Sequence, residues 1–334
     1  MLMHGFLAWL FTWICPHCSH WQSVLQPDSR DADRLDGLLW VFIDVCGTIW
    51  LLVMLVLAIA IWRRHKPDRP PLQRNAGQEK GSALIVGAAV TATVLIIGGL
   101  TFLSYAATRP LVGEADDTLV VRLRGYQWWW QVTYANPDPA KTFRTANEIH
   151  IPVGKPVRFE LSAADVIHSF WVPNLLGKQD LLPGRNNQVT LTADHPGVYR
   201  GQCAEFCGLQ HAHMALLVIA DDSGAFDAWR NSQIQQAAPS DDPDAAKGRQ
   251  FVTSHACAAC HTIRGTSAAG TLGPDLTHVA SRQTIAAGLL PTTRGSLAAW
   301  IVDPQTIKPG NNMPMVPMSA DDVTSVSAYL ATLK

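Results

Sequence analysis

The sequence predicts a multidomain membrane protein of three parts: a two-helix transmembrane hairpin, a β-sandwich and a small all-α domain. Two long apolar runs near the start predict the hairpin, and short alternating strands across residues 117–220 predict the sandwich. A C-x-x-C-H motif in a final segment of helical periodicity predicts the third part. The formal net charge of −1 gives no electrostatic basis for binding nucleic acid.

The hairpin covers residues 38–109, with apolar runs at 38–62 and 82–107 that are each long enough to cross a bilayer. The first run contains one charge, Asp44, and the second contains none, so buried helices of a soluble core are the less favoured alternative. The loop between the runs carries six Lys or Arg against Asp68 and Glu79. By the positive-inside rule this loop is cytoplasmic, and the segments on both sides of the hairpin are expected outside.

Residues 1–37 form an N-terminal outer segment whose first apolar stretch is similar to a signal peptide. It lacks the usual basic start, so cleavage is left open, as is lipidation of Cys15 or Cys18. Those two cysteines, with His17 and His20, could also bind a metal, which is the less favoured interpretation.

The region of short strands has Pro, Gly and Asn between its runs and shows clear alternation at Val157, Phe159 and Leu161. No helical pattern interrupts it, which favours a β-sandwich. Residues 221–243 are polar and are expected to form a linker with one short helix. Residues 244–334 form the all-α domain.

The last helix of that domain is expected to begin at Ser319, with Asp322 three residues on as its capping partner. Its periodicity predicts four buried side chains, which are Val323, Val326, Leu330 and Leu333.

The stretch "CAACH" carries the attachment signature of haem c, in which Cys257 and Cys260 bond the porphyrin and His261 ligates the iron. A chance pair or a redox disulfide is the alternative. A later loop, "IKPGNNMPMVPM", offers three methionines as the second iron ligand, which together with histidine gives a raised potential. The domain resembles class I cytochromes c throughout, and the "NNMP" setting of that family favours Met313. By the same resemblance, Pro274 packs near the haem-ligating histidine.

The stretch "GQCAEFCGLQHAHM" gathers Cys203, Cys207, His211 and Met214 in one segment. The two cysteines could form a disulfide in an oxidising compartment. Thiolate, imidazole and thioether together favour copper instead. A single blue copper needs only one cysteine, so two cysteines favour two thiolates that bridge two coppers.

That interpretation needs a second histidine, which His168 offers in "SAADVIHSFWVPNL". His213 is the alternative, but it follows His211 by two residues and is expected to be exposed on the opposite face. Met214 and the backbone carbonyl of Glu205 would then be weak ligands on the two coppers.

Residues 22–220 resemble subunit II of the haem–copper cytochrome c oxidases. The resemblance depends on four phrases, which are "GYQWWWQVTY", "ADVIHSFWVPNLLGKQD", "LPGRNNQ" and "GVYRGQCAEFCGLQHAHM". The appended haem c domain resembles the branch in which the electron donor is fused to the oxidase. The resemblance implies a cupredoxin-like β-sandwich that holds a dinuclear copper centre called CuA.

By this resemblance the copper ligands are His168, Cys203, the Glu205 carbonyl, Cys207, His211 and Met214. The Glu205 side chain would reach a magnesium ion shared with the catalytic subunit. Trp128 corresponds to the tryptophan through which the family receives electrons, although aromatic residues in strands more often serve packing.

The resemblance implies an electron-transfer subunit of a terminal oxidase. Electrons from an external donor, such as a cytochrome c, would pass through haem c and CuA to subunit I, which reduces dioxygen to water with proton pumping. Other oxidase subunits and membrane lipid are the further partners. The chain would be a multi-pass protein of a bacterial cytoplasmic membrane, with its soluble domains on the periplasmic side.

Two alternatives stay open: the small subunit of a CuA-containing nitric oxide reductase, and a free-standing membrane-tethered electron carrier. The family often has a glutamate near the start of the second span that is associated with proton uptake. The run from Ser82 has no acid, and Asp44 and Glu79, the latter expected in the loop, offer no clear substitute.

Overall fold

The computed structural model describes residues 22–63, 76–109 and 119–334, with side chains at 76–78 left aside. Cys15, Cys18 and the predicted start of the sandwich at residue 117 lie outside these ranges. The chain divides into two compact units. One contains the helical hairpin, and the other contains both the sandwich and the C-terminal helical domain. Each is described by itself.

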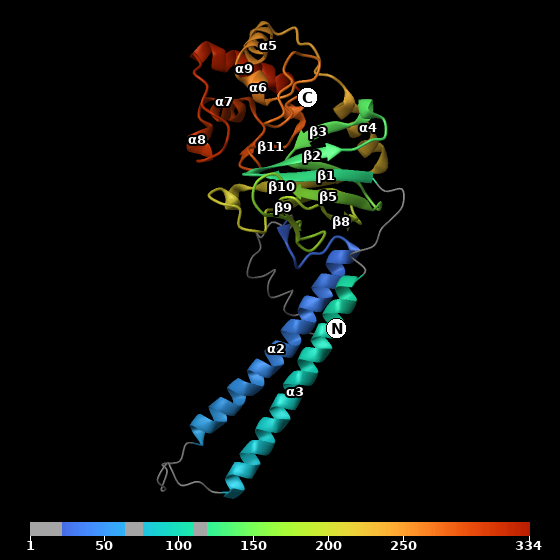
Figure 1. Ribbon diagram of the computed structural model, residues 1–334, viewed down its shortest axis with the longest axis vertical. Helices are drawn as coiled ribbons and strands as arrows, with labels where there is room; N and C mark the ends of the chain where they lie inside the picture. The colour runs from blue at the N-terminus through green and yellow to red at the C-terminus, as the bar shows by residue number, and fades with distance from the viewer. Residues whose placement is uncertain (1–21, 64–75, 110–118) are drawn as a thin grey trace. The chain divides into compact units, whose positions relative to one another are not determined.

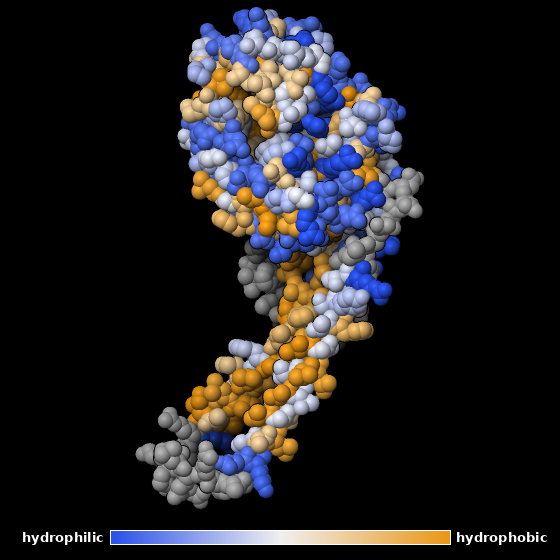
Figure 2. Space-filling view, viewed as in Figure 1, coloured by the Kyte–Doolittle hydropathy of each residue, from blue (hydrophilic) through white to orange (hydrophobic). Residues whose placement is uncertain are grey.

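The hairpin consists of helix α2 (Arg30–Trp62) and helix α3 (Ala76–Thr108) (Figure 1). Both are long and apolar enough to cross a membrane, and Figure 2 shows apolar side chains along both. Each has 33 residues and so is about 50 Å long, more than the ~30 Å hydrocarbon core of a bilayer. Both helices start earlier than the predicted spans, while α2 ends at Trp62 as predicted and α3 ends one residue later, at Thr108.

The expectation that Glu79 lies in the loop is wrong, because α3 begins before it. Glu79 occupies the first turn of α3. A carboxylate there interacts favourably with the positive end of the helix dipole.

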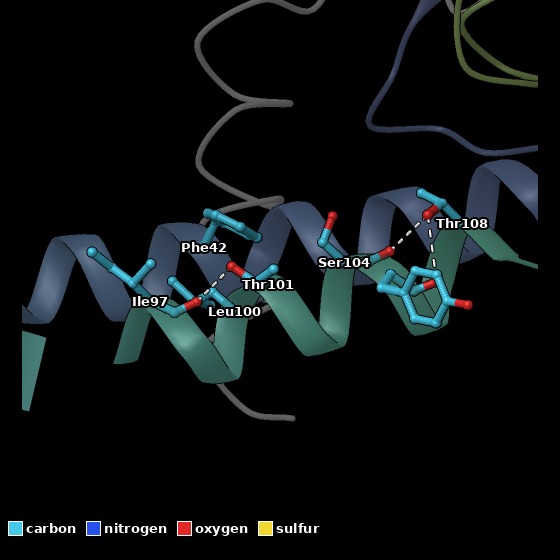
Figure 3. A pocket seen from close by; sticks show the side chains of 7 residues that line it. Phe42, Ile97, Leu100, Thr101, Ser104 and Thr108 are labelled. Atoms are coloured by element: carbon cyan, nitrogen blue, oxygen red, sulfur yellow. Dashed lines mark hydrogen bonds between the residues drawn. The ribbon is translucent and has the colours of Figure 1, made fainter. Parts of the chain in front are cut away.

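A cavity of about 440 Å³ lies between the two helices of the hairpin (Figure 3). The hydroxyl groups of Thr101 and Thr108 donate to the carbonyls of Ile97 and Ser104 in their own helix. These two hydroxyl groups are therefore already paired within α3.

The sandwich has two main sheets. The larger has the order β3-β2-β1-β5-β8, with β1 and β5 parallel and the other pairs antiparallel. Its strands are β1 (Leu119–Tyr126), β2 (Trp129–Tyr134), β3 (Phe143–Ala146), β5 (Val157–Ala163) and β8 (Asn187–Leu191). The smaller has the order β4-β10-β9, with strands β4 (Glu148–Pro152), β9 (Gly197–Gln202) and β10 (Ala215–Asp221).

Side chains that alternate along the strands fill the space between these sheets. Val157, Phe159 and Leu161, the residues whose alternation predicted a strand, are fully buried in β5. Val121 and Leu123 of β1 join them in the same core. A small ribbon of β6 (His168–Phe170) and β7 (Gln179–Leu181) pairs antiparallel beside the sandwich core.

The segment 221–243, predicted as a linker with one helix, contains α4 (Ser223–Ile234). This helix packs on the sandwich. The ring of Trp229 lies 5.2 Å from that of Tyr134 and 4.1 Å from that of His150, centroid to centroid. The segment therefore contains the one helix that was expected, and side chains of that helix pack on the sandwich core.

The C-terminal domain is mainly helical. Its helices are α5 (Pro243–Ser254), α6 (Cys257–Cys260), α7 (Arg294–Val302), α8 (Pro304–Ile307) and α9 (Ala320–Thr332), with short strands β11 (Thr284–Ile285) and β12 (Leu290–Pro291). Short 3-10 helices η3 (Pro139–Lys141), η4 (His211–His213) and η5 (Val279–Ser281) complete the element order.

Helix α9 begins as predicted. Ser319 is its N-cap, and Ser319 and Asp322 form a reciprocal capping box. Val326, Leu330 and Leu333 are buried, and Val323 is half-buried against the same core. Helix α5 crosses α9 closely at Gly248, where a β-carbon would lie 2.0 Å from the carbonyl oxygen of Ser325. The three-part fold class is thereby confirmed.

Candidate metal centre and haem attachment site

The candidate metal centre lies in the loop between β9 and β10. Cys203 follows β9 directly, and its backbone N–H donates to the carbonyl of Met214 at 3.0 Å, which closes the loop at its base. Gly208 allows the turn, because its φ is +113° and a β-carbon there would lie 3.1 Å from Cζ2 of Trp128. The backbone thus folds the stretch "CAEFCGLQHAHM" back on itself and brings its donor atoms together.

Four further donor groups surround the thiols of Cys203 and Cys207, which makes six donors in all. The Sγ atoms of Cys203 and Cys207 are 3.8 Å apart. His168 Nδ1 lies 3.9 Å from Cys203 Sγ, and His211 Nδ1 lies 3.6 Å from Cys207 Sγ. Met214 Sδ is 3.8 Å from Cys207 Sγ, and the Glu205 carbonyl oxygen is 3.3 Å from Cys203 Sγ.

The two cysteines are free thiols. Their sulfur separation of 3.8 Å is nearly twice the ~2.05 Å of a disulfide bond. The ligand atoms of His168, Cys203 and Cys207 lie within 4.8 Å of one another, and all three residues are buried. Soft sulfur and imidazole donors in a buried cluster suit copper, so the residues present fit the metal that the loop was predicted to hold.

The thiols of Cys203 and Cys207 form a hydrogen bond with each other. The hydrogen bond between the sulfurs lowers the pKa of Cys203 and raises the pKa of Cys207. One thiolate is therefore favoured near neutral pH, and the thiolate is the form that ligates metals.

The imidazole of His168 is fully buried and oriented by Asp165. Its Nε2 lies 2.9 Å from Oδ1 of Asp165, so that an Nε2–H donated to the carboxylate leaves Nδ1 free toward Cys203. The backbone N–H groups of Gln127 and Val166 also donate to Asp165 and hold it in place. Burial opposes a charge on His168, but hydrogen bonds to Cys203 and Asp165 raise its pKa above the usual value.

Gly125 makes room for this imidazole. A β-carbon at residue 125 would lie 2.8 Å from Cδ2 of His168 and 2.9 Å from its Cγ. Gly125 pairs with Ala163 at the end of the parallel β1–β5 ladder. The glycine therefore lets the His168 ring lie close to this end of the sheet.

The other two histidines of the loop differ as predicted. His211 is half-buried and faces the thiols, whereas the side chain of His213 is exposed. The ring of His213 has Gln210 as its neighbour, with Nδ1 2.8 Å from Oε1.

Trp128 lies beside the ligand loop. Its Nε1–H donates to the carbonyl oxygen of Cys207 at 2.9 Å, and Gln127 Nε2 donates to the same oxygen at 2.7 Å. Trp128 is buried in the sandwich core, and Trp129 turns to the other face and stacks on Tyr126.

The C-x-x-C-H motif forms α6 and the residue after it. Cys257 and Cys260 are half-buried free thiols. His261 Nδ1 lies 2.7 Å from the carbonyl oxygen of Pro274, to which an Nδ1–H can donate, leaving Nε2 for a metal. Burial lowers the pKa of His261 and favours the neutral, ligating form. A β-carbon at Gly273 would lie 2.6 Å from Cε1 of this ring.

The three candidate methionines differ in burial. Met313 and Met318 are half-buried and pack against the core of the helical domain, whereas Met315 is 59% exposed. Two hydrogen bonds hold the backbone of Met313: its N–H donates to Asn311 Oδ1 at 2.8 Å, and its carbonyl accepts from Gln305 Nε2 at 2.9 Å.

Three residues of the site were missed by sequence analysis. Asp165 could have been found, because it precedes a ligand histidine by three residues, where a carboxylate often orients the ring. Gln127 donates to the carbonyl of Cys207, and Lys308 donates to the carbonyl of Trp128. These partners lie far along the chain, so no local sequence pattern marks either residue.

Comparison with known proteins shows which family the chain belongs to. The family description "Cytochrome C oxidase subunit II, periplasmic domain" matches residues 119–221, and "Cytochrome c" matches residues 245–334. The chain is 35% identical over 317 residues to cytochrome c oxidase subunit 2 of Alkalihalophilus pseudofirmus, covering 93% of this chain and 91% of the relative. This chain belongs to the cytochrome c oxidase subunit 2 family. The subunit 2 of Bacillus subtilis is 30% identical over 331 residues, with 93% and 92% covered.

The chain is also similar to a solved structure of an oxidase subunit. The periplasmic domain of subunit II of the cytochrome oxidase of Bradyrhizobium japonicum is 32% identical, covers 37% of this chain and 96% of that chain, and has a TM-score of 0.34.

Family membership confirms the predicted resemblance and makes the chain a subunit of an oxidoreductase complex. The subunit II domain and the cytochrome c domain together imply copper and haem c, and they support electron transfer in a terminal oxidase. The two apolar helices indicate anchoring in a membrane.

Proposed function

We propose that this subunit passes single electrons from an external donor through haem c and dinuclear CuA to haem–copper subunit I, which reduces dioxygen to water with proton pumping. The observation that carries the proposal is the cluster of six donor groups formed by the thiols of Cys203 and Cys207 and four groups around them, with Sγ atoms 3.8 Å apart and an imidazole nitrogen beside each. A single-copper site has no use for the second thiolate.

In this assignment Cys203, Cys207, His168 and His211 would hold the two copper ions, and Met214 and the Glu205 carbonyl would be the weak ligands. Cys257 and Cys260 would attach haem c covalently, and His261 and Met313 would ligate its iron. When bound, copper and haem c each supply a reversible one-electron redox centre.

The role of the polypeptide is to fix the orientation of these ligands and to exclude water from them. His168, Cys203, Cys207 and Met214 are all buried, and Asp165 fixes the orientation of the His168 ring. A stiff, fully packed sandwich changes little when the charge of its ligands changes, which favours rapid electron transfer.

Trp128 is proposed to receive electrons for the copper centre. Its indole N–H bonds the carbonyl of a bridging cysteine, which connects an aromatic ring to the metal ligand Cys207 through one hydrogen bond. Packing explains the burial of Trp128 but does not require that hydrogen bond.

The partners follow from the proposed complex. Oxidase subunit I receives the electrons, and other oxidase subunits belong to the same complex. An external donor such as a cytochrome c supplies the electrons, and lipid surrounds the two helices. The soluble domains would lie on the periplasmic side of a bacterial inner membrane. The exposed side chain of Glu205 is free to reach a magnesium ion at the boundary with subunit I.

The decisive experiment measures copper and covalent haem per purified chain and records an electron paramagnetic resonance spectrum. We expect two coppers, one haem c and a mixed-valence copper signal. Cys207→Ser should abolish that signal. Cys46→Ser is the matched control, because Cys46 is an exposed free thiol in α2 and should leave copper unchanged. A wild-type protein with a Cys203–Cys207 disulfide and no copper would overturn the proposal.

The same preparation separates the two alternatives. Consumption of nitric oxide instead of dioxygen by the purified complex would identify a nitric oxide reductase. Isolation without a large haem-bearing subunit would identify a free-standing carrier.

A further inference from the structure

A lysine of the C-terminal domain is buried against the copper domain. Lys308, which follows α8, is only 2% exposed. Its Nζ donates to the carbonyl oxygens of Trp128 at 2.9 Å, His213 at 2.8 Å and Ala286 at 2.9 Å. An ammonium group has three protons, and each has an acceptor here. Lysine is almost never fully buried without such partners, so the site is built around this side chain.

The three acceptors come from three separate parts of the chain. Trp128 precedes β2, His213 precedes the copper ligand Met214, and Ala286 belongs to the same domain as Lys308. One ammonium group therefore joins the candidate electron-receiving tryptophan, the copper-ligand loop and the cytochrome c domain.

The residues after Lys308 continue this contact. Gln210 Nε2 of the copper loop donates to the Pro309 carbonyl at 2.9 Å. At Gly310, with φ of +82°, a β-carbon would lie 3.4 Å from Cδ2 of Leu209 and 3.5 Å from Cη2 of Trp128. The backbone of residue 310 thus lies against the indole ring, and Trp128 is only 8% exposed.

This segment leads directly to the candidate haem ligand. Met313 lies three residues beyond Gly310, and the Gln305 side chain holds the loop by donating to the carbonyls of Asn311 and Met313. The short loop from Lys308 to Met313 therefore connects the iron-ligand position to the surface of Trp128.

A second set of contacts joins the copper domain and the cytochrome c domain. The N–H of Ala215 donates to the carbonyl of Ala287 at 3.1 Å, and the N–H of Gln283 donates to the buried carboxylate of Glu148 at 2.8 Å. Gly288 approaches so closely that a β-carbon there would lie 2.9 Å from Cβ of Ala215. The two domains are thus in direct contact at several points near Lys308.

We propose that Lys308 is a positioning residue that fixes the cytochrome c domain on the copper domain, so that the loop 308–313 covers Trp128 and external donors reach copper only through haem c. The inference rests on the proposed function. It also specifies where an external donor can bind. The loop 308–313 covers the face of the sandwich that bears Trp128, so a soluble donor protein cannot bind there.

The chemistry of lysine suits this role better than that of its substitutes. A side chain of similar length without the ammonium group would leave three buried carbonyls without this donor, which favours separation of the domains. The planar guanidinium of arginine directs its donors as a fork in one plane, unlike the ammonium group of lysine.

The test compares Lys308→Met with Lys247→Met in the intact oxidase complex. Lys247 belongs to the same domain, and its side chain is 72% exposed beside Asp244, so its replacement controls for the loss of one positive charge. Copper and haem per chain are measured first. Hydroxyl-radical footprinting, read by mass spectrometry, then reports the exposure of Trp128, and rapid mixing with ferrous cytochrome c reports the order and rate of haem c and copper reduction.

We expect Lys308→Met to keep copper and haem c while Trp128 becomes several-fold more reactive toward radicals. Electron transfer from haem c to copper should slow by about tenfold or more, because a displaced partner loses its productive geometry. Copper reduction by the soluble donor should also lose its lag behind haem c reduction. Gln210→Ala, which removes the hydrogen bond to Pro309 and the contact with the His213 ring but keeps all three acceptors of Lys308, should change the same readouts in the same direction by less.

Unchanged footprinting and unchanged transfer in Lys308→Met would overturn the proposal. Loss of copper in that variant would also overturn it, because Lys308 would then support the copper loop itself. If Trp128 becomes exposed in Lys308→Met but the wild type transfers no electrons between its two sites, the docking role stands and the proposed function fails.

Discussion

The indole N–H of Trp128 donates a hydrogen bond of 2.9 Å to the carbonyl oxygen of Cys207, the second bridging thiol in the proposed copper centre. The same ring faces Gly310 of the cytochrome c domain. Trp128 therefore touches both the copper loop and the loop that leads to Met313. Its position suits a relay between the two domains.

Replacing Trp128 with Phe keeps an aromatic ring in the core and removes the hydrogen bond to Cys207. We expect copper and haem content to stay the same while electron transfer from haem c to copper slows several-fold. Rapid-mixing spectroscopy on the full complex measures this rate. Trp129→Phe is the control, because Trp129 stacks on Tyr126 away from the copper loop. An unchanged rate in Trp128→Phe would assign Trp128 to packing alone.

Asp165→Asn tests the orientation of the His168 ring. An amide has one acceptor oxygen where the carboxylate has two, so it cannot accept from both Gln127 and His168 as Asp165 does. Loss of a partner that orients a metal-ligating histidine typically lowers metal affinity by about 10- to 100-fold. Competition with a copper chelator measures the effect.

Asp227→Asn is the control for that substitution, since Asp227 is an exposed carboxylate paired with Arg230 on α4. It should leave copper affinity unchanged. Equal copper retention by both variants would show that Asp165 does not act through His168.

Gly273→Ala tests the proposed haem ligand, His261. The added methyl group would lie 2.6 Å from Cε1 of His261, so the ring or the backbone must shift. We expect a changed haem absorption spectrum and a changed redox potential. Haem attachment should be reduced but not lost, because Cys257 and Cys260 are unchanged. Gly295→Ala is the control, because the nearest atom to its β-carbon position is Oγ1 of Thr293 at 3.9 Å. A spectrum identical to that of the wild type would contradict the placement of His261.

Local patterns were enough to predict much of this molecule. The C-x-x-C-H motif, the capping box of Ser319 and Asp322, and the alternation in β5 each depend on residues a few positions apart. The copper loop is similar, because most of its donors lie between Cys203 and Met214. Hydrogen-bond geometry and side-chain chemistry act over such short spans, so the sequence shows them directly.

The features that sequence reasoning missed depend on partners far along the chain. Lys308 meets Trp128 across 180 positions, and no periodicity marks a lysine as buried. Trp229 packs on Tyr134 from a segment whose polar composition predicted a linker. Gly125 is needed only because His168 folds against it. The burial and contacts of these residues depend on the tertiary fold, and sequence composition does not reveal them.

The capping box of α9 predicts a pH dependence for the cytochrome c domain. Hydrogen bonds from the Ser319 hydroxyl and backbone N–H lower the pKa of Asp322 from its usual 3.8. A carboxyl group with a lowered pKa stabilises the fold above its unfolded pKa, and this contribution is lost as the pH falls through the folded value. Asp322→Asn should therefore unfold at a lower urea concentration than the wild type at pH 7, and the difference should shrink below about pH 3.8. Haem absorption follows the unfolding. Asp321→Asn, beside the cap but outside the capping box, is the control, and a difference that stays constant with pH would sink this prediction.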